Sequence, residues 1–407
     1  MSLSTLNLAV IGAGPVGLAL ALHAARALPH ASVTLFDARP VDKDVSGDPR
    51  ALALSLGSVQ LLERLGAWRA NLAQPILEVH VSQAPPSTTA LLGSLFGEPA
   101  LTIRAIDEAV PLLGAVLTYG GIGAPLQAAW LEAERADPQR LHSRFDARVS
   151  ALKNVDGRVE VDAGIAERFD LAVVAEGGVF ADPQRALPSL QPRRAWRHDY
   201  RQTAWVGRVA FEAGAAPRRV GDAFERFTRH GPAALLPLKD GDAALVWCVP
   251  SDADPVRELD DAQRVAVLNT VFHPAAGRIA SMTPLKPFPL GLTAERTLTD
   301  GRTVRIGNAA QTLHPVAGQG LNLGLRDAFE LVRALARNPD VDAVLRRLEW
   351  QRAPDRWGMI LATDFLARSF TWKLPGAGAA RGIGLFALQA LGPVKSAIAR
   401  QMMFGSR

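Results

Sequence analysis

Apolar residues near the N terminus form two short runs with a helix-length segment between them. Residues 6–12 (LNLAVIG) are mostly apolar over the length of a strand, and residues 32–39 (SVTLFDAR) form a second strand-like run. Residues 16–28 between them have the length and composition of a helix. Strand, glycine-rich turn, helix and strand predict a βαβ unit in a parallel sheet with both faces covered.

The pattern changes after about residue 180 and returns near residue 303. Four closely spaced strand-like runs fall in this middle part, at residues 202–212, 224–231, 233–238 and 243–249. The last two are joined by a Lys-Asp-Gly-Asp turn, which is typical of a hairpin. These runs predict a mainly antiparallel sheet inserted into the first domain.

We therefore predict an α/β fold with a discontinuous first domain, an inserted domain and a C-terminal segment. The boundaries are 1–180 and 290–364 for the first domain, 181–289 for the inserted β-sheet domain, and 365–407 for a basic, apolar helical segment. Within the first domain, a buried strand at 303–310 leads into a helix at 324–337.

Charge is distributed unevenly along the 407 residues. The net charge is +5, and residues 365–407 contain six Lys or Arg residues and no acidic residue. The basic excess is therefore local, and no basic stripe with interleaved aromatic residues occurs, so we expect no nucleic-acid partner. Residues 382–404 mix apolar stretches with cations. This composition fits a peripheral membrane contact and equally a packed helical hairpin with a basic outer face.

Cysteine and histidine give little sign of a metal or disulfide site. Cys248 is the only cysteine, and the eight histidines do not fall at metal-ligand spacings. We therefore predict no metal and a cytoplasmic protein, with peripheral attachment to the inner membrane as the alternative that the C-terminal segment leaves open.

The glycine-rich turn after the first strand, GAGPVG, matches the dinucleotide-binding fingerprint G-x-G-x-x-G. Glycine is required at Gly12, Gly14 and Gly17 because the backbone turns tightly and approaches a pyrophosphate, beside the N–H groups of a helix start. Asp37 ends the next strand, where an acid accepts hydrogen bonds from ribose hydroxyls. The combination predicts a dinucleotide site and leaves FAD and NAD as alternatives.

A second glycine-rich segment joins the strand at 303–310 to the following helix. The residues that shape it or offer side-chain amides are Pro315, Gly318, Gln319, Gly320 and Asn322. N–H groups at such a helix start suit a phosphate or the carbonyl oxygens of a flavin ring. Glycines that serve helix packing alone are the alternative.

Together, GAGPVG with Asp37, DPRALALS (48–55) and IGNAAQTLHPVAGQGLNLGLRD (306–327) resemble the FAD-dependent aromatic hydroxylases, in particular the ubiquinone-biosynthesis branch. The resemblance implies a glutathione-reductase-type, Rossmann-like FAD-binding domain with an inserted substrate domain. It implies FAD as cofactor and NAD(P)H as reductant. It also implies a hydrophobic aromatic substrate, a prenylated phenol or quinone precursor, whose ring receives one oxygen atom from dioxygen.

The resemblance also implies roles for single residues. The three fingerprint glycines would hold the FAD pyrophosphate, Asp37 the adenosine ribose, and Arg50 would lie near the flavin and pyrophosphate. The residues that would complete the cofactor site are Glu176, Gly177, Asn308, Pro315, Gly318, Gln319, Gly320 and Asn322. His314 is the candidate for the active-site wall.

The chain departs from the family pattern at three places. Glu176 replaces an Asp, Gln311 replaces a His, and Tyr119-Gly120-Gly121 stands where an Arg is usual. The departures at Gly120 and Gln311 keep open a second function, that of a non-catalytic subunit of a multi-enzyme quinone-biosynthesis complex. A related flavoprotein that shares the FAD fold, such as a polyprenyl reductase, is the other alternative.

Overall fold

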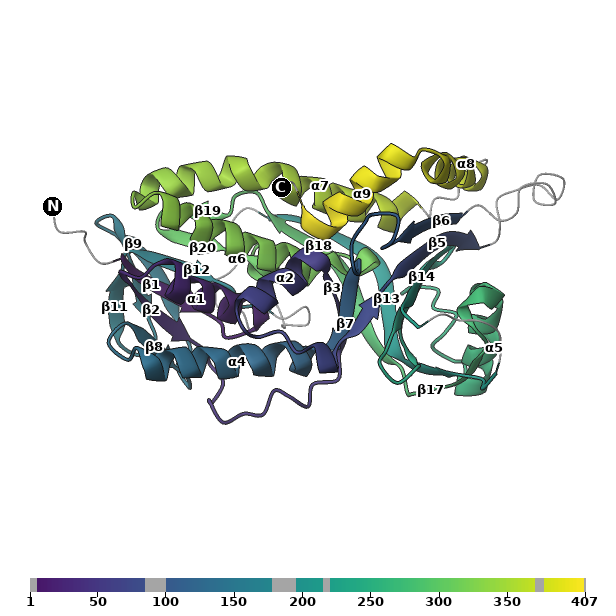
Figure 1. Ribbon diagram of the computed structural model, residues 1–407, viewed down its shortest axis with the longest axis horizontal. Coiled ribbons are helices and arrows are strands. Elements are labelled where there is room, and N and C mark those ends of the chain that lie inside the picture. The colour runs from purple at the N-terminus through teal and green to yellow at the C-terminus, as the bar shows by residue number, and fades with distance from the viewer. Residues whose placement is uncertain (1–5, 85–99, 178–194, 215–219, 370–376, 406–407) are drawn as a thin grey trace.

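The computed structural model describes residues 6–84, 100–177, 195–214, 220–369 and 377–405 (Figure 1). The start of the predicted inserted domain, residues 181–194, lies outside this part of the chain. Within it, a parallel sheet covered by helices lies beside a large, mostly antiparallel sheet, and the long C-terminal helices run along one edge of both (Figure 1).

The first domain is built on a six-stranded sheet that is parallel except at one edge. Its strands, in spatial order, are β19 (Thr299–Asp300), β20 (Thr303–Arg305), β12 (Leu171–Val174), β1 (Leu6–Ile11), β2 (Ala31–Phe36) and β8 (Leu141–Arg144). β1 pairs in parallel with both β12 and β2, and α1 (Pro15–Ala27) connects β1 to β2. The predicted βαβ unit is therefore confirmed.

Different layers cover the two faces of this sheet. Leu8 and Val10 of β1 pack against α1, α4 (Tyr119–Ala136) and α6 (Gln319–Arg337). Ala9 and Ile11 pack against a small antiparallel sheet formed by β9 (Ala151–Val155), β10 (Arg158–Asp162) and β11 (Ala166–Phe169). Because both faces are buried, β1 carries an almost continuous apolar run instead of an alternating one.

The large sheet has nine strands within the described residues. In spatial order they are β21 (Gln311–Thr312), β18 (Lys286–Glu295), β13 (Ala195–Phe211), β16 (Ala243–Pro250), β15 (Gly231–Pro237), β14 (Asp222–Thr228), β5 (Glu78–Ala84) and β6 (Ala100–Arg104), with β17 (Ile279–Met282) paired to β13. Neighbouring strands are antiparallel except β14 and β5. The sheet thus takes strands from outside the predicted segment 181–289.

The two faces of the large sheet have different neighbours. Phe224 and Leu235 lie on the outer face, in the apolar cluster that includes Leu268 of α5 (Asp261–Val271). Phe227 lies on the opposite face and packs against Val316 of the 3-10 turn η4 (Val316–Gly318). We call this second face the inner face. It therefore looks towards the second glycine-rich segment.

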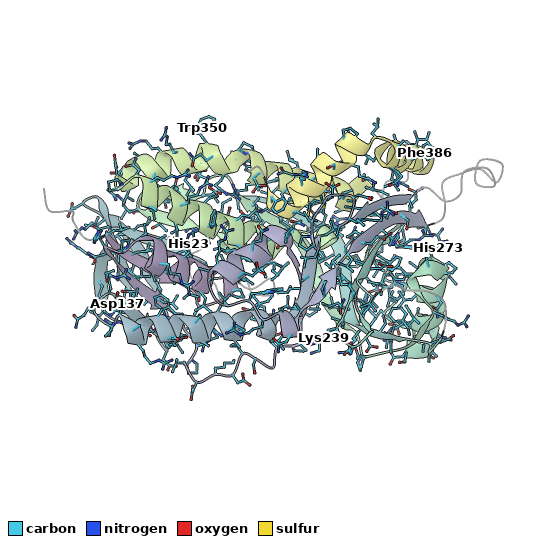
Figure 2. All side chains as sticks on the ribbon, in the orientation of Figure 1. His23, Asp137, Lys239, His273, Trp350 and Phe386 are labelled. Carbon is cyan, nitrogen blue, oxygen red and sulfur yellow. The ribbon has the colours of Figure 1, made fainter. Side chains whose placement is uncertain are left out.

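The remaining elements connect these sheets. A third sheet consists of β3 (Ala51–Ser55), β7 (Gly114–Thr118) and β4 (Gln74–Ile76). The helix α2 (Leu56–Arg64) packs against β3 and β7. The short 3-10 turns are η1 (Ala70–Leu72), η2 (Pro274–Ala276) and η3 (Gly307–Ala309). The C-terminal helices are α7 (Val341–Ser369), α8 (Ala377–Ala390) and α9 (Gly392–Phe404). The exposed side chains of Trp350 in α7 and Phe386 in α8 both point away from the body of the protein (Figure 2).

A buried ionic network joins α6, α7 and α9. Asp355 of α7 accepts hydrogen bonds from Arg326 of α6 and Gln401 of α9, both at 3.0 Å, and lies 2.9 Å from Arg352. Arg352 also donates to Asp327 of α6 at 2.9 Å. These ionic side chains are at most 6% exposed. Because buried charges are tolerated only when paired, the network fixes how the three helices pack.

Candidate functional site

The fingerprint turn lies where the carboxyl ends of β1 and β12 meet. Gly12 has a φ of +103°, and a Cβ there would lie 2.9 Å from the Glu176 amide nitrogen. A Cβ at Gly17 would overlap the carbonyl oxygen of Gly12. A Cβ at Gly14 would meet only the Tyr119 hydroxyl, at 3.5 Å. Gly12 and Gly17 are thus required by packing, whereas Gly14 leaves the backbone open to a ligand.

Asp37 closes the turn from the end of β2. Its carboxylate accepts a hydrogen bond from the Ala13 amide at 2.5 Å and another from the Arg39 amide at 2.8 Å. The Arg39 guanidinium reaches both Asp37 at 3.0 Å and the Ala13 carbonyl at 2.7 Å. Asp37 is therefore held beside the fingerprint, and Arg39 is a neighbour that the motif did not single out.

The second glycine-rich segment packs directly on the fingerprint. A Cβ at Gly324 would lie 2.8 Å from the Cα of Gly307 and 2.9 Å from the Val16 side chain. A Cβ at Gly177 would lie 3.2 Å from the backbone of Asn308. The two glycine motifs and the Glu176-Gly177 pair, far apart in the sequence, are thus brought together.

The predicted helix at 324–337 begins earlier, at Gln319, so the predicted loop positions Gln319, Gly320 and Asn322 lie in its first turns. Its N-cap, Gly318, has a φ of +59°, and no side chain caps the helix. Gly14 likewise begins α1 without a side-chain cap. Two helix N termini with free positive dipole ends therefore belong to the same region of the structure.

Asn322 has a different role from the predicted one. Its side-chain oxygen accepts from the Ser55 amide and the Ser58 hydroxyl, both at 2.8 Å. Its amide nitrogen donates to the carbonyls of Ala53 and Gly318, both at 3.0 Å. All four hydrogen-bonding positions are used. Asn322 therefore fixes β3 and α2 to the glycine segment and offers no side-chain group to a flavin.

The other predicted residues of this segment differ in what surrounds them. Pro315 is the N-cap of η4, and Gln319 is buried, with its side-chain oxygen 3.5 Å from Arg326. A Cβ at Gly320 would meet no atom within 4 Å, so packing does not require that glycine. Asn308 is partly exposed beside Gly177. Gly320 and Asn308 can therefore face a cofactor without competing protein contacts.

Arg50 reaches the fingerprint through Tyr119. Its guanidinium lies over the Tyr119 ring at 4.3 Å and pairs with Asp48 at 2.7 Å. Desolvation raises the pKa of the Tyr119 hydroxyl. The departure at Gly120 has a steric reason, because a Cβ there would overlap the carbonyl oxygen of Ser46. The loop before β3 thus occupies the place that a longer side chain at position 120 would need.

The other two departures from the family pattern, Glu176 and Gln311, lie in different surroundings. Partial burial, and then the charge of Asp37, raises the pKa of the Glu176 carboxyl. Gln311 is buried, donates to Asp327 at 3.0 Å and accepts from Arg356 at 2.7 Å. Gln311 therefore links β21 to the buried ionic network, a role for which an amide suffices.

His314 lies away from the fingerprint, against the large sheet. Its Nε2 lies 3.1 Å from the side-chain oxygen of Gln202, and its Nδ1 accepts from the Val316 amide at 3.3 Å. Burial lowers the pKa of His314 to about 3, so the ring is neutral. Both ring nitrogens are engaged by protein groups, which makes His314 a positioning residue for η4.

Neutral burial of His314 predicts a loss of stability in acid. Below the ordinary pKa of 6.5 the unfolded chain binds a proton that the native state does not bind until about pH 3, so stability falls across that window. The contribution is about 2 kcal/mol at pH 5. We expect His314→Gln to flatten the pH dependence of urea unfolding between pH 7 and 5. The exposed His30, changed to Gln, is the control, and equal pH slopes for the His314 variant and the wild type would contradict the prediction.

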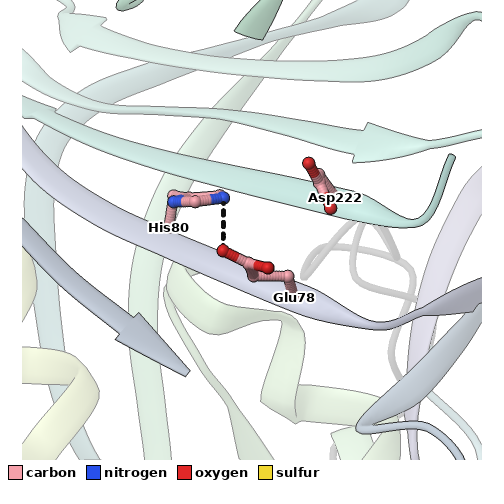
Figure 3. A group of neighbouring side chains, drawn as sticks. All are labelled: Glu78, His80 and Asp222. Carbon is pink, nitrogen blue, oxygen red and sulfur yellow. Dashed lines mark ion pairs between the residues drawn. The ribbon is translucent and has the colours of Figure 1, made fainter. Parts of the chain in front are cut away.

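One group of described residues lies close enough to hold a cation, on the outer face of the large sheet (Figure 3). Glu78 and His80 of β5 and Asp222 of β14 have ligand atoms within 4.8 Å of one another. His80 also pairs with Glu78 at 3.1 Å and stacks on Phe224 at 4.8 Å. These contacts account for the geometry, and we assign no metal to the group.

The converging residues fit FAD. Close-packed glycines allow a pyrophosphate to approach, two uncapped helix starts favour its charge, and Asp37 lies at the ribose position. Sequence reasoning missed Arg39 and gave Tyr119 no role of its own, because neither residue belongs to a motif. The sequence offered only one hint of a role for each: Arg39 lies two residues after Asp37, and Tyr119 directly follows β7. When bound, FAD takes electrons from NAD(P)H and activates dioxygen.

Comparison with known proteins agrees with this geometry. A family model described as an FAD binding domain matches residues 198–354. The chain is 30% identical to the ubiquinone hydroxylase UbiL of Rhodospirillum rubrum, over 97% of this chain and 88% of that protein. It is 29% identical to the 3-demethoxyubiquinol 3-hydroxylase of Escherichia coli, over 96% of each.

Solved structures share the fold at lower sequence identity. Klebsiella pneumoniae HpxO, complexed with FAD and uric acid, superposes with a TM-score of 0.71 at 17% identity, covering 98% of this chain and 97% of that one. The p-nitrophenol 4-monooxygenase PnpA of Pseudomonas putida gives 0.71 at 16% identity, covering 99% of each. The predicted FAD-binding α/β fold is confirmed.

Proposed function

Because the chain belongs to the family of FAD-dependent monooxygenases that includes the ubiquinone hydroxylases, we propose that it hydroxylates the ring of a prenylated phenol or quinone precursor in ubiquinone biosynthesis. The resemblance found in its motifs is confirmed, and the chain is an enzyme with FAD as cofactor and NAD(P)H as reductant. Two electrons from NAD(P)H and one dioxygen molecule yield one ring hydroxyl and one water.

The observation that carries the proposal is the inner face of the large sheet. It presents Val81, Phe227, Val246 and Cys248 towards the second glycine-rich segment, with Phe227 in contact with Val316. An apolar surface at this place binds a hydrophobic ring and excludes water from the reacting atoms. The chain's own work is thus binding, orientation and exclusion of water.

The test is direct. We expect the purified protein to be yellow and its NAD(P)H oxidation to be stimulated by a prenylated phenol, with a hydroxylated product detected by mass spectrometry. Deletion of the gene should cause one ring-unhydroxylated quinone intermediate to accumulate. A colourless protein that does not bind added FAD, or unchanged ubiquinone synthesis after deletion, would contradict the proposal.

The C-terminal segment has one packed and one exposed side. Leu385, Ala399 and Met403 are buried against β6 and α2, whereas Ile383 is 69% and Phe386 53% exposed. In the described part of the chain, no single helix has the length and hydropathy to span a bilayer. Only Ala380–Ala390 with Gly392–Phe404 passes that test, as a pair bent by 94°.

We propose that the exposed side of α8 and α9 rests on an anionic membrane surface, where a hydrophobic prenylated substrate is available. The support is the combination of exposed apolar side chains with a segment that carries cations and no acid. We expect Phe386→Glu with Ile383→Glu to reduce co-sedimentation with phosphatidylglycerol vesicles at least about tenfold, since each side chain loses roughly 1.5–3 kcal/mol of burial. Ile165→Glu, at a 77% exposed position outside the segment, is the matched control. Unchanged vesicle binding by the double variant would exclude this surface.

A further inference from the structure

Glu225 is a carboxyl in the middle of the apolar inner face. In the sheet it lies opposite Val81 of β5 and Ala234 of β15. It shares its face with Phe227, two residues along β14, because side chains alternate along a strand. Phe227 packs against Val316 of η4. Glu225 therefore lies on the same face as the contact with the second glycine-rich segment.

Solvent reaches the inner face around Glu225. Most residues of β14, β15 and β16 are buried, but Glu225, Leu236 and Val246 are each partly exposed. Val206 of β13, which pairs with Val246, is also partly exposed. These four residues share one face, as the strand register shows. They form an accessible apolar surface that contains one carboxyl.

This carboxyl forms no hydrogen bond or ion pair with the described residues. Its apolar surroundings raise the pKa of Glu225 to about 8. Glu225 is therefore mostly protonated at neutral pH. A protonated carboxyl offers one O–H donor and acceptor oxygens. This carboxyl, set among apolar side chains and without a partner among the described residues, is available to a ligand that brings a polar group to the inner face.

We propose that Glu225 recognises the phenolic hydroxyl of the substrate, with its carboxyl hydrogen-bonded to that oxygen while the inner face holds the aromatic ring. The inference rests on the proposed function. It adds a specific contact, between Glu225 and the phenolic oxygen, that selects phenols as the substrate class. It explains why a polar residue stands on an apolar face. It also predicts that an aromatic compound without a ring hydroxyl is bound less tightly.

The experiment uses the FAD-loaded full chain and two probes of nearly equal size. The probes are 2-allylphenol and allylbenzene, which differ by one hydroxyl. Their dissociation constants are measured from the perturbation of the flavin absorbance. We expect the wild type to bind 2-allylphenol about five- to tenfold more tightly, the worth of one hydrogen bond of about 1–1.5 kcal/mol.

Two substitutions separate recognition from structure. Glu225→Gln keeps a donor and an acceptor, so most of the preference for the phenol should remain. Glu225→Leu keeps the size and removes both groups, so the two probes should bind equally well. The control is Val246→Leu on the same face, which should shift both dissociation constants alike and leave their ratio unchanged. FAD content and thermal unfolding show whether each variant is folded.

The outcomes distinguish this inference from the proposed function. A preference for the phenol that persists in Glu225→Leu, or equal binding of both probes by the wild type, overturns the role of Glu225 alone. A wild-type holoprotein that binds neither probe and shows no phenol-stimulated NAD(P)H oxidation overturns the proposed function and this inference with it. Loss of the preference in Glu225→Leu with its retention in Glu225→Gln supports the assignment.

Discussion

Gly17→Ala should weaken the binding of FAD. The new Cβ would overlap the carbonyl oxygen of Gly12, while β1 on one side and α1 on the other hold the turn in place. Overpacking of this kind costs about 1–3 kcal/mol or more. Because FAD requires the closed turn, the cost should appear as a roughly 10- to 100-fold loss in affinity. Titration of the apoprotein with FAD, followed by flavin fluorescence, measures it.

Gly14→Ala is the matched variant that separates packing from ligand contact. Gly14 has a φ of −75°, and its Cβ would meet only the Tyr119 hydroxyl at 3.5 Å. The stability of the apoprotein to urea should therefore remain that of the wild type. FAD affinity should still fall, because the methyl group stands where the pyrophosphate approaches the backbone. Wild-type FAD affinity in both variants would show that the fingerprint does not hold the cofactor.

The elements predicted most accurately from the sequence are those that local patterns specify. The run at 6–12 marked a strand buried on both faces, and the glycines after it marked the turn into α1. The Lys-Asp-Gly-Asp sequence marked the β15–β16 hairpin, which the register confirms. In each case one short segment contains both the apolar period and the turn residues that define the element.

The extent of the large sheet could not be predicted in the same way. Residues 78–83 alternate like a strand, but nothing local shows that β5 pairs in parallel with β14. Parallel pairing between distant segments depends on the packing of the whole domain. The early start of α6 is similar. Gly318 and Gly320 are typical of a loop, yet the four hydrogen bonds of Asn322 hold the helix start in place.

The candidate site likewise contains residues that a sequence motif predicts and residues that it does not. The fingerprint glycines and Asp37 follow from a motif with a physical reason, and the structure brings them together with Gly177 and Asn308. Glu225 has no motif. In the sequence, Glu225 is one polar residue in an alternating strand-like run. Only the strand register shows that it faces inward among apolar neighbours. A single carboxyl becomes informative only when its surroundings in the fold are known.

Asp355→Asn should lower the free energy of unfolding by about 3–5 kcal/mol, the cost of breaking a buried ion pair. Asp355 is shared by Arg326, Arg352 and Gln401, so the substitution removes a carboxylate from two buried guanidinium groups, of which Arg352 keeps its pair with Asp327. The large effect follows because the two guanidinium groups are at most 6% exposed, so water compensates poorly for the lost carboxylate. Urea unfolding followed by tryptophan fluorescence measures the change.

The same substitution should also loosen α9, which provides a second, independent measurement. Gln401→Leu removes only the α9 contact and leaves Asp355 paired with both arginines, so its effect on global unfolding should be small. In both variants, hydrogen exchange across residues 392–404 should accelerate, because the hydrogen bond between the Gln401 side chain and Asp355 is lost or weakened. Asp107→Asn breaks the exposed pair with Arg104 and should leave the urea midpoint unchanged. If Asp355→Asn were as stable as this control, the network would contribute nothing to helix packing. If α9 exchanged as slowly in Gln401→Leu as in the wild type, its other contacts, among them the Ser396 hydrogen bond to Glu108 and the burial of Met403, would suffice to hold it in place.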